Sequence, residues 1–554
     1  MNNSKAEKSI LFHILPYVVL GAVFCVLIIL NIFYYDHFLD SDMSAELIFS
    51  KLLAEEGRLI ASNDWYYSTE FRILYTQLIM VPLFYITDNF HIVRAVTNIV
   101  TYILMLVSYF YMMKPFKVNR RLVAYTGAVL LIPFSETLVT HMQLGNTYMP
   151  HIILLFFAMG MYMRLSAYTG EIRALRRTVL LLFYITLSVI LGMSGVRYLL
   201  ALYAPLVTAS VIHVAKGDEF ALFRESFGVS ETGMPYLKRL IRAEEVKYLF
   251  YAAVGTAAAV SGYIINSLVL GRIYVFQTYG STDFINIYDP SGTELVKRLQ
   301  NTLGSLLMLL GYVPDKSVMS LRGIVSIGAF ILTVLILVFA YRSARTTSGR
   351  RLYMSIFFFS ALFVNLFFFI FTDSTLVPRY FITILSFALP LFCFYEENED
   401  FKFDRALVAL LLSVFIILGF AKTVYSFVTT DKNEKLKEAI AAIEGEGLDF
   451  GYATYWNANI LTELSNGRVE TANIRNVQDM QYFIWSTPYK YYEDDYHEGR
   501  VFLLLNDEEE LSLNESVKLK NVGETRNIGD YYLHIFEDKE ELFGAYEKGG
   551  EKFR

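Results

Sequence analysis

Long apolar stretches alternate with short polar connections over roughly the first 430 residues of the chain. A helix needs about 20 apolar residues to cross a bilayer, and eleven stretches reach or approach that length. They cover residues 10–34, 92–113, 121–139, 148–165, 177–193, 196–214, 247–270, 318–341, 351–371, 376–395 and 405–428. The pattern predicts a mainly α-helical fold class, a polytopic membrane helix bundle of about eleven spans over residues 1–430.

A further apolar run, residues 71–86, would reverse the sidedness of every later span if it crossed the membrane. Four connections between spans are rich in Lys and Arg: residues 114–121, 164–177, 216–247 and 342–351. Basic connections stay in the cytoplasm, and these four share one side only if residues 35–91 form a single outer loop. Because the run is short and contains Arg72, Gln77 and Pro82, we expect a short helix inside that loop that does not cross.

This arrangement predicts a multi-pass protein of the plasma, or inner, membrane with a cytoplasmic N-terminus. Lys5 and Lys8 precede a first apolar run that is too long for a secretory signal, so we expect a retained signal anchor. The large loop 35–91, the loop 271–317 and the C-terminal residues then lie on the outer side.

Residues 431–554 have a different composition, rich in Glu, Lys, Asn and Gly. Short strand-like runs at 451–455, 501–505 and 531–536 alternate with helical ones such as 432–443. The sequence therefore predicts a small extracytoplasmic α/β domain of about 120 residues at the C-terminus.

Composition agrees with a membrane protein, since 55% of the residues are hydrophobic and only 18% are charged. In soluble domains, roughly 45–50% of the residues are hydrophobic and about 25% are charged. The mean hydropathy is +0.40. A formal net charge of −6 argues against a nucleic-acid partner, which requires a basic face. The two cysteines, Cys25 and Cys393, lie in apolar runs, so no disulfide framework is expected, and a Cys-free outer tail suits a bacterial cell envelope.

Two carboxylates follow the first span directly, in the segment Asp40-Ser41-Asp42. After them comes an amphipathic stretch, with apolar residues at 45, 48, 49, 52 and 53, which we expect to be a helix in the outer interface plane. The positive N-terminal end of a helix favours ionised carboxylates. Such a carboxylate can take a proton from an acceptor hydroxyl or help to hold a divalent metal. The alternative is that Asp42 only caps the helix.

Aromatic and polar residues gather in two of the outer loops. Trp65, Tyr66, Glu70 and Arg72 combine rings with charged groups, as a sugar-binding surface requires, although Trp and Tyr also collect at any membrane interface. His141, Gln143 and Asn146 add polar groups in the second loop, where an ordinary solvated turn is the alternative. We take these seven residues as candidate substrate-binding residues.

Two arginines stand at outer helix ends, where the positive-inside rule disfavours them. They are Arg197 and Arg379, the latter followed by Tyr380. A lipid phosphate is one reason for a cation at this depth. The alternatives are snorkelling of the long side chains, or pairing of Arg379 with Asp373.

Taken together, these features resemble the GT-C superfamily of polytopic membrane glycosyltransferases, which includes protein O-mannosyltransferases and aminoarabinose transferases. The acidic pair after the first span carries the resemblance, with Asp40-Ser41-Asp42 in place of the usual Asp-Glu. Residues 86–94 (ITDNFHIVR) resemble the junction before the next span, without its glycine. Residues 377–380 (VPRY), running into Pro390, resemble the segment that opens a late span.

The resemblance implies transfer of a sugar from a polyprenyl-phosphate donor to a glycan, lipid or protein acceptor on the outer face, with inversion. Asp42 or Asp40 would deprotonate the acceptor, while Arg379, Tyr380 and Arg197 would bind the donor phosphate. No cofactor is certain, and a divalent metal, Mg²⁺ or Mn²⁺, stays open.

Two other classes are compatible with eleven spans: a transporter or lipid flippase of the cell envelope, and a non-catalytic envelope-assembly scaffold. Transporters place ionisable or helix-breaking residues near the bilayer midplane. Here the charged residues cluster at the ends of the spans, and no internal repeat is visible. These features favour the enzyme over the transporter.

Overall fold

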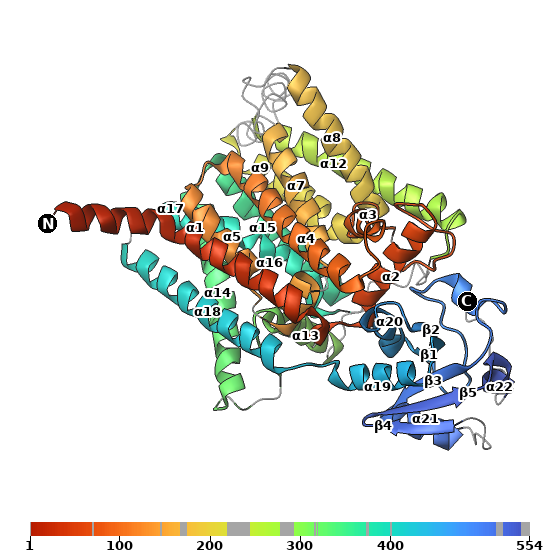
Figure 1. Cartoon of the computed structure of the whole chain (residues 1–554). Coiled ribbons are helices and arrows are strands. Elements are labelled where there is room, and N and C mark those ends of the chain that lie inside the picture. The colour runs from red at the N-terminus through yellow and green to blue at the C-terminus, as the bar shows by residue number, and fades with distance from the viewer. Residues whose placement is uncertain are drawn as a thin grey trace.

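The computed structural model has a helical part and a smaller C-terminal α/β part packed against one of its ends (Figure 1). The structure describes residues 2–68, 71–133, 135–144, 147–166, 174–218, 244–276, 293–314, 317, 319–372, 376–398, 402–516 and 524–544.

Within the described residues, eight helical segments are long and apolar enough to cross a membrane. They lie in α1 (Asn2–Phe33), α4 (Phe90–Met113), α7 (Met149–Ser166), α8 (Ala174–Met193), α12 (Glu244–Leu268), α14 (Leu321–Thr346), α15 (Gly349–Phe371) and the run formed by η7 (Pro378–Phe381), α16 (Ile382–Ser386) and α17 (Ala388–Glu397). The mainly α-helical fold class is confirmed.

The other three predicted spans are also helical. The predicted span 196–214 corresponds to the short η4 (Leu199–Tyr203) followed by α9 (Ala204–Ala215), and the span 405–428 corresponds to α18 (Lys402–Thr429), with 28 residues. The predicted span 121–139 corresponds to α5 (Arg120–Leu131), which has only 12 residues. Pro133 follows its end, and a proline disfavours helical geometry in the residue before it. The prediction of a full span at 121–139 is therefore corrected to a shorter helix followed by α6 (Glu136–Leu138) and the π-helix η3 (Val139–Leu144).

Glycines allow α8 and α12 to pack closely. A Cβ atom on Gly192 would collide with the backbone oxygen of Ala259, and one on Gly262 with that of Val189. Small residues at such crossings are typical of helix pairs in membranes, where close backbone approach replaces the hydrophobic effect as a source of stability.

Within the described residues 35–68 and 71–89, no helix is long and apolar enough to span a membrane. These residues contain η1 (Tyr35–Phe38), α2 (Ser41–Glu55) and α3 (Gln77–Phe84). The eight residues of α3 extend over about 12 Å, less than half of a bilayer core. Helices therefore form at both expected places, and the location of the first one in the outer interface plane stays a prediction.

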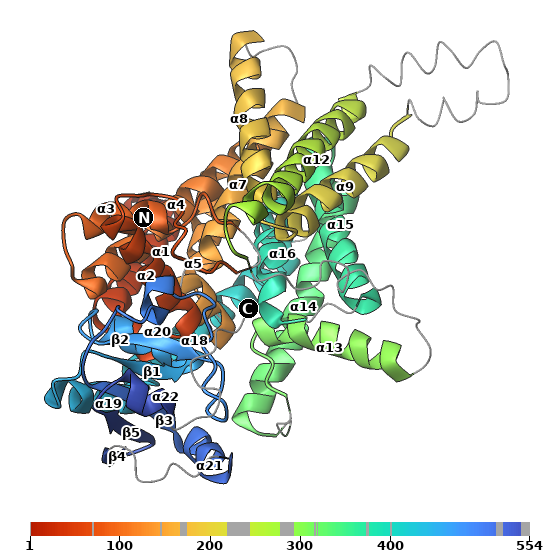
Figure 2. The ribbon, with the colours of Figure 1, turned by 90° about the vertical axis from the view of Figure 1, so that its right-hand side faces the viewer.

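Three of the basic connections meet at one end of the helical part. Arg164 donates to the carbonyl oxygen of Tyr111 (2.7 Å), and Arg350 to that of Pro115 (3.0 Å). The first turns of α8 and α12, which follow two of the basic connections, lie at the opposite end of the molecule from the C-terminal part (Figure 2). The described residues of the basic connections and the C-terminal part therefore lie on opposite sides of the helical bundle.

The C-terminal part contains a five-stranded sheet of order β2-β1-β3-β5-β4. Its strands and helices are α19 (Glu434–Gly445), β1 (Phe450–Thr454), α20 (Tyr455–Leu464), β2 (Glu470–Ile474), η8 (Tyr489–Tyr492), β3 (Val501–Asn506), α21 (Asp507–Ser516), β4 (Glu524–Ile528), β5 (Tyr531–Phe536) and α22 (Lys539–Gly544). β1 is parallel to β2 and β3, whereas β5 is antiparallel to β3 and β4. The predicted α/β composition and three of its strands are confirmed, and β2 and β4 were missed.

The remaining described helices are η2 (Lys114–Phe116), which continues α4, and η5 (Leu270–Arg272) and α13 (Thr293–Leu309), both within the expected outer loop 271–317 or at its edge.

The large loop and the C-terminal part pair through their backbones. Ser486 donates its N–H to the carbonyl of Tyr66 (3.0 Å), and Tyr489 to that of Asp64 (3.1 Å). The backbone N–H of Lys490 also reaches Asp64 Oδ1 (3.0 Å). The helix α2 therefore lies between the membrane part and the C-terminal part, with α20 against it (Figures 1 and 2).

Candidate active site

Asp40 is the N-cap of α2. Its backbone is extended, and its Oδ1 accepts a hydrogen bond from the backbone N–H of Met43 (2.9 Å). Aspartate is among the best capping residues. The structure thus corrects the alternative considered for Asp42, since Asp40 is the cap and Asp42 is free of that role.

Asp42 faces two partners that come from distant parts of the chain. Tyr455 Oη, at the start of α20, donates to Asp42 Oδ1 (2.6 Å). Arg379 Nη1, in η7, lies 3.8 Å from Asp42 Oδ2. The Arg379 and Asp42 side chains are 35% and 29% exposed, so a ligand can reach both.

Glu46, one turn further along α2, has three polar partners from the large loop. Arg72 Nη1 lies 3.1 Å from Glu46 Oε1, and Thr76 Oγ1 lies 3.4 Å from Oε2. Tyr75 Oη lies 2.8 Å from Glu46 Oε1 and 2.6 Å from the carbonyl oxygen of Thr147. Since the tyrosine hydroxyl has a single proton, a protonated Glu46 that donates to Tyr75 satisfies both of these contacts.

Arg197 joins the same cluster through His151. Its Nη1 donates to His151 Nε2 (2.7 Å). An imidazole that accepts at Nε2 carries its proton on Nδ1, which lies 2.6 Å from Tyr198 Oη. The centroids of the His151 and Tyr75 rings are 5.5 Å apart. The residues that bind Arg197 and those that bind Glu46 are therefore neighbours.

Burial and neighbouring charges shift the titration of this cluster. Burial raises the pKa of Asp40 to about 6, and the charge of Asp42 adds to the rise. Burial also raises the pKa of Glu46 to about 7 in spite of Arg72. The pKa of His141 falls to about 3, first through burial and then through the charges of Arg379 and Arg197. Two permanent cations therefore act on one neutral imidazole, an arrangement that favours an anionic ligand.

A second arginine–carboxylate pair lies nearby but is closed to solvent. Arg94, at the start of α4, donates from Nε and Nη2 to the two oxygens of Glu463 in α20 (3.0 and 2.8 Å). Its Nη2 also donates to the carbonyl oxygen of Met43 (2.8 Å). Both side chains are 0% exposed. The arginine of the 86–94 segment thus connects α4, α2 and the C-terminal part.

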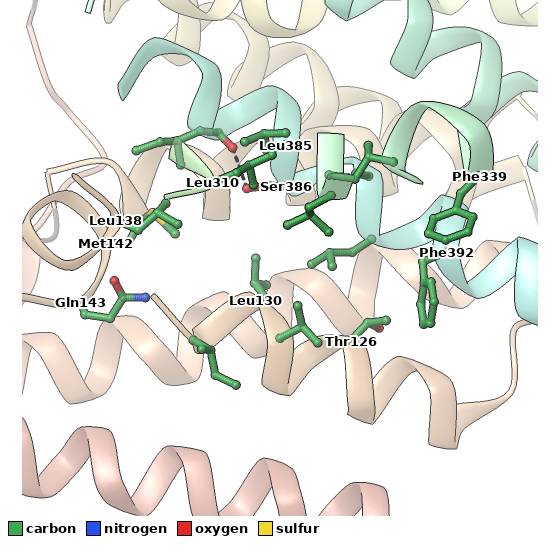
Figure 3. A pocket seen from close by; sticks show the side chains of 17 residues that line it. Thr126, Leu130, Leu138, Met142, Gln143, Leu310, Phe339, Leu385, Ser386 and Phe392 are labelled. Atoms are coloured by element: carbon green, nitrogen blue, oxygen red, sulfur yellow. Dashed lines mark hydrogen bonds between the residues drawn. The ribbon is translucent and has the colours of Figure 1, made fainter. Parts of the chain in front are cut away.

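An apolar cavity of about 130 Å³ lies beside the cluster, between α5, η3, α14, α16 and α17. Gln143 and Met142 stand at one end of it, and Phe339 and Phe392 at the other (Figure 3). Its wall includes Ile382, three residues after Arg379. The cavity therefore borders η3, which carries His141, and α16, which directly follows η7 and its Arg379.

Several predicted residues have other surroundings. Trp65 is 5% exposed and packs on Phe49, with ring centroids 5.0 Å apart. This corrects the expectation that its ring faces a ligand, because Trp65 lies in an apolar cluster with residues of α2 and of the large loop, against which Leu270, Tyr274 and Phe276 pack. Tyr66 contributes its backbone oxygen to the pairing described above, and its ring meets that of Tyr489.

Of four further candidates, two have partners inside the protein and two lie outside the described residues. Gln143 is buried and donates to the carbonyl oxygen of Leu131 (3.0 Å), and Tyr380 stacks on Phe369. Glu70 and Asn146 lie outside the described residues, as does Asp373, the alternative partner of Arg379. In the described part of the chain, no three His, Cys, Asp or Glu side chains lie close enough together to hold a metal ion.

Sequence reasoning missed Glu46, His151 and Glu463 as members of the site. Glu46 had a signal, since it follows Asp42 by four residues on a predicted helix and so shares its face. His151 and Glu463 had none, because their roles depend on which distant segments meet.

Solved structures share this fold over almost the whole chain. ArnT from Cupriavidus metallidurans in the apo state superposes with a TM-score of 0.52 at 11% identity, covering 96% of this chain and 98% of that one. ArnT bound to undecaprenyl phosphate gives a TM-score of 0.51 at 12% identity, covering 94% and 97%. The Archaeoglobus fulgidus oligosaccharyltransferase gives a TM-score of 0.48 at 11% identity, covering 90% and 70%. No family model and no curated protein sequence matches. The chain is therefore a multi-pass membrane protein with the fold of the GT-C membrane glycosyltransferases.

Proposed function

We propose that this protein transfers a sugar from a polyprenyl-phosphate donor to an acceptor hydroxyl, with Asp42 as the general base. The observation that carries the proposal is the accessible meeting of Asp42 and Arg379 beside an apolar cavity. ArnT, which shares the fold, has been solved with undecaprenyl phosphate bound. A donor of the same chemistry has a charged head and an isoprenoid tail.

The charged head of such a donor suits Arg379. Its guanidinium is 35% exposed and only loosely paired with Asp42, and guanidinium groups bind phosphate oxygens through paired hydrogen bonds. Arg197, which also acts on His141, adds positive charge to the same place. Charge that develops on the lipid phosphate as the glycosidic bond breaks is stabilised there.

The apolar cavity suits the first isoprenoid units of the donor. Fourteen of its 17 lining residues are apolar, the exceptions being Thr126, Gln143 and Ser386. Burial of hydrocarbon contributes about 25 cal/mol per Å². A lipid tail in this cavity would place its phosphate toward η3 and η7.

Among the three carboxylates of α2, Asp42 is the best placed to act as the base. Asp40 uses one oxygen for the helix cap, and Glu46 is enclosed by Arg72, Tyr75 and Thr76 with 10% of its side chain exposed. Asp42 would take the proton of the acceptor hydroxyl as its oxygen bonds to the anomeric carbon. The electron pair of the breaking C–O bond passes to the lipid phosphate, and the anomeric centre inverts.

We place the site and residues 431–554 on the outer face of the membrane, because the basic connections lie at the opposite end of the bundle and such connections stay in the cytoplasm. Labelling of single cysteines in a Cys-free background tests this orientation. An impermeant reagent should modify a cysteine at Asn63 in intact cells and spare one at Arg120. The reverse pattern would contradict the orientation.

The proposed reaction is tested with the purified full-length protein in lipid nanodiscs and a panel of polyprenyl-phosphate sugars. Wild type and the control variant Asp88→Asn, which changes an exposed aspartate of the same loop, should release polyprenyl phosphate. Asp42→Asn should release it about 10²- to 10⁴-fold more slowly. Movement of the lipid-linked sugar between leaflets without release would instead indicate a flippase and overturn the proposal.

A further inference from the structure

The first turn of α2, which carries Asp42, is held by the helix α20 of the C-terminal part. Ser41 Oγ donates to the backbone oxygen of Tyr455. Tyr455 Oη donates to Asp42 Oδ1 (2.6 Å). Two consecutive residues of α2 thus bind the same residue at the start of α20.

Near its other end, α20 binds Arg94, which in turn binds Met43, the next residue of α2. Glu463, nine-tenths along α20, binds Arg94 by two hydrogen bonds of 2.8 and 3.0 Å. Arg94 in turn donates to the carbonyl oxygen of Met43, whose N–H is bound by Asp40. Because Arg94 and Glu463 are fully buried, water cannot replace these bonds at low cost.

The ring of Tyr455 is also fixed in place. It stacks on Trp485, with centroids 4.8 Å apart and planes inclined by 28°, and meets the edge of Phe483 at 5.8 Å. Aromatic contacts of this kind restrict rotation of the side chain. The hydroxyl that binds Asp42 is therefore preorganised rather than freely rotating.

We infer that α20 is a structural part of the catalytic centre and that Tyr455 is a positioning residue for Asp42. The tyrosine binds Oδ1, whereas Oδ2 lies 3.8 Å from Arg379 and is the oxygen that we assign to the acceptor. Preorganisation of a reacting group lowers the barrier because its orientation is settled before the reaction. This inference rests on the proposed function in one respect, that Asp42 is the base.

The variant Tyr455→Phe removes the hydroxyl and keeps the ring against Trp485. It should lower kcat for sugar transfer about tenfold and leave KM for the lipid-linked donor unchanged. Tyr531→Phe is the matched control, since Tyr531 bonds α20 at Asn457 (3.4 Å) and does not contact Asp42. It should behave as wild type.

A second measurement needs no turnover. Amide hydrogen exchange of the peptide covering residues 41–47, in the full-length protein, should be several times faster in Tyr455→Phe and unchanged in Tyr531→Phe. Wild-type exchange together with wild-type kcat in Tyr455→Phe would overturn the inference. A lower kcat with a raised KM and wild-type exchange would also overturn it, because Tyr455 would then contact a substrate. If wild type releases no polyprenyl phosphate from any donor, the proposed function fails, and the exchange result alone decides whether α20 holds α2.

Discussion

Two arginine–carboxylate pairs lie on either side of the first turn of α2, and they differ in almost every physical respect. The buried pair, Arg94 and Glu463, is 0% exposed and joined by two hydrogen bonds of 2.8 and 3.0 Å. The open pair, Arg379 and Asp42, is 35% and 29% exposed and separated by 3.8 Å.

The difference indicates separate roles for the two pairs. Removing one partner of a buried pair leaves a charge without compensation, at a cost of about 3–5 kcal/mol, whereas an exposed pair contributes about 0–1 kcal/mol. A ligand can therefore separate Arg379 from Asp42 at little cost. The buried pair fixes the geometry around α2, and the open pair is available to a substrate.

The largest expected effect is on the open pair. Asp42→Asn should lower the rate of polyprenyl-phosphate release about 10²- to 10⁴-fold, the range for loss of a general base. Asp40→Asn should retain most of the rate, because Asn caps a helix about as well as Asp. The comparison is made by single-turnover kinetics on both variants. Equal losses in the two would show that the carboxylates act as a unit and would remove the case for Asp42 alone.

The next effect concerns the buried pair. Glu463→Gln should destabilise the protein by about 3–5 kcal/mol, because Arg94 keeps its charge and loses its counter-ion. Thermal unfolding of the purified protein measures this loss, with Asp88→Asn as the control. Asp88 is 83% exposed and bound to Lys51 (2.6 Å), so its loss should cost less than about 1 kcal/mol. Similar unfolding temperatures for the two variants would contradict a structural role for the buried pair.

The raised pKa of Glu46 predicts that the free energy of unfolding depends on pH. Its pKa rises from 4.5 to about 7 through burial, so the folded state favours the protonated carboxyl. The corresponding stability is present below pH 4.5 and is lost as the pH rises to about 7, a change of about 3 kcal/mol. Glu46→Gln should flatten this dependence when unfolding is followed from acidic to neutral pH. A slope that matches that of wild type would mean that Glu46 is ionised throughout.

The smallest of these effects is expected at Arg379 of the open pair, where two substitutions distinguish the role of its charge from the role of its shape. Arg379→Ala should reduce turnover by about 10²-fold, as when a stabiliser of transition-state charge is removed. Arg379→Lys should recover only part of the rate, because an ammonium lacks the planar fork of a guanidinium. Steady-state kinetics with a lipid-linked donor distinguish the variants. Wild-type turnover in a folded Arg379→Ala protein would assign this residue to membrane anchoring.

Much of the fold could be predicted from local patterns. Apolar length and basic connections predicted the helical bundle and the short helix α3, because both depend on residues close in sequence. The edge strand β4 was missed because its five residues, Glu524–Ile528, are mostly polar and exposed and show no apolar alternation. The shortened helix α5 was missed because an apolar run was given more weight than Pro133.

The candidate site was predictable only in part, because most of its contacts join residues that lie far apart in the sequence. Asp42 and Arg379 could be found as charges placed at outer helix ends. Their meeting, and the contacts of Asp42 with Tyr455 and of Arg94 with Glu463, join residues more than 300 positions apart. No local pattern encodes such a pairing. Trp65 shows the converse, because its ring, interfacial on local evidence, is buried in an apolar cluster that the distant Tyr274 and Phe276 join.

Direct binding of undecaprenyl phosphate to the purified full-length protein tests the central claim that the open pair receives a lipid phosphate. Wild type should bind saturably, and Arg379→Ala should bind at least about tenfold more weakly, since a charge-assisted hydrogen bond is lost. Asp42→Asn should bind as tightly as wild type or more tightly, because it removes the carboxylate that competes for Arg379, even though it lowers turnover about 10²- to 10⁴-fold. Equal affinities of wild type and Arg379→Ala would contradict the claim.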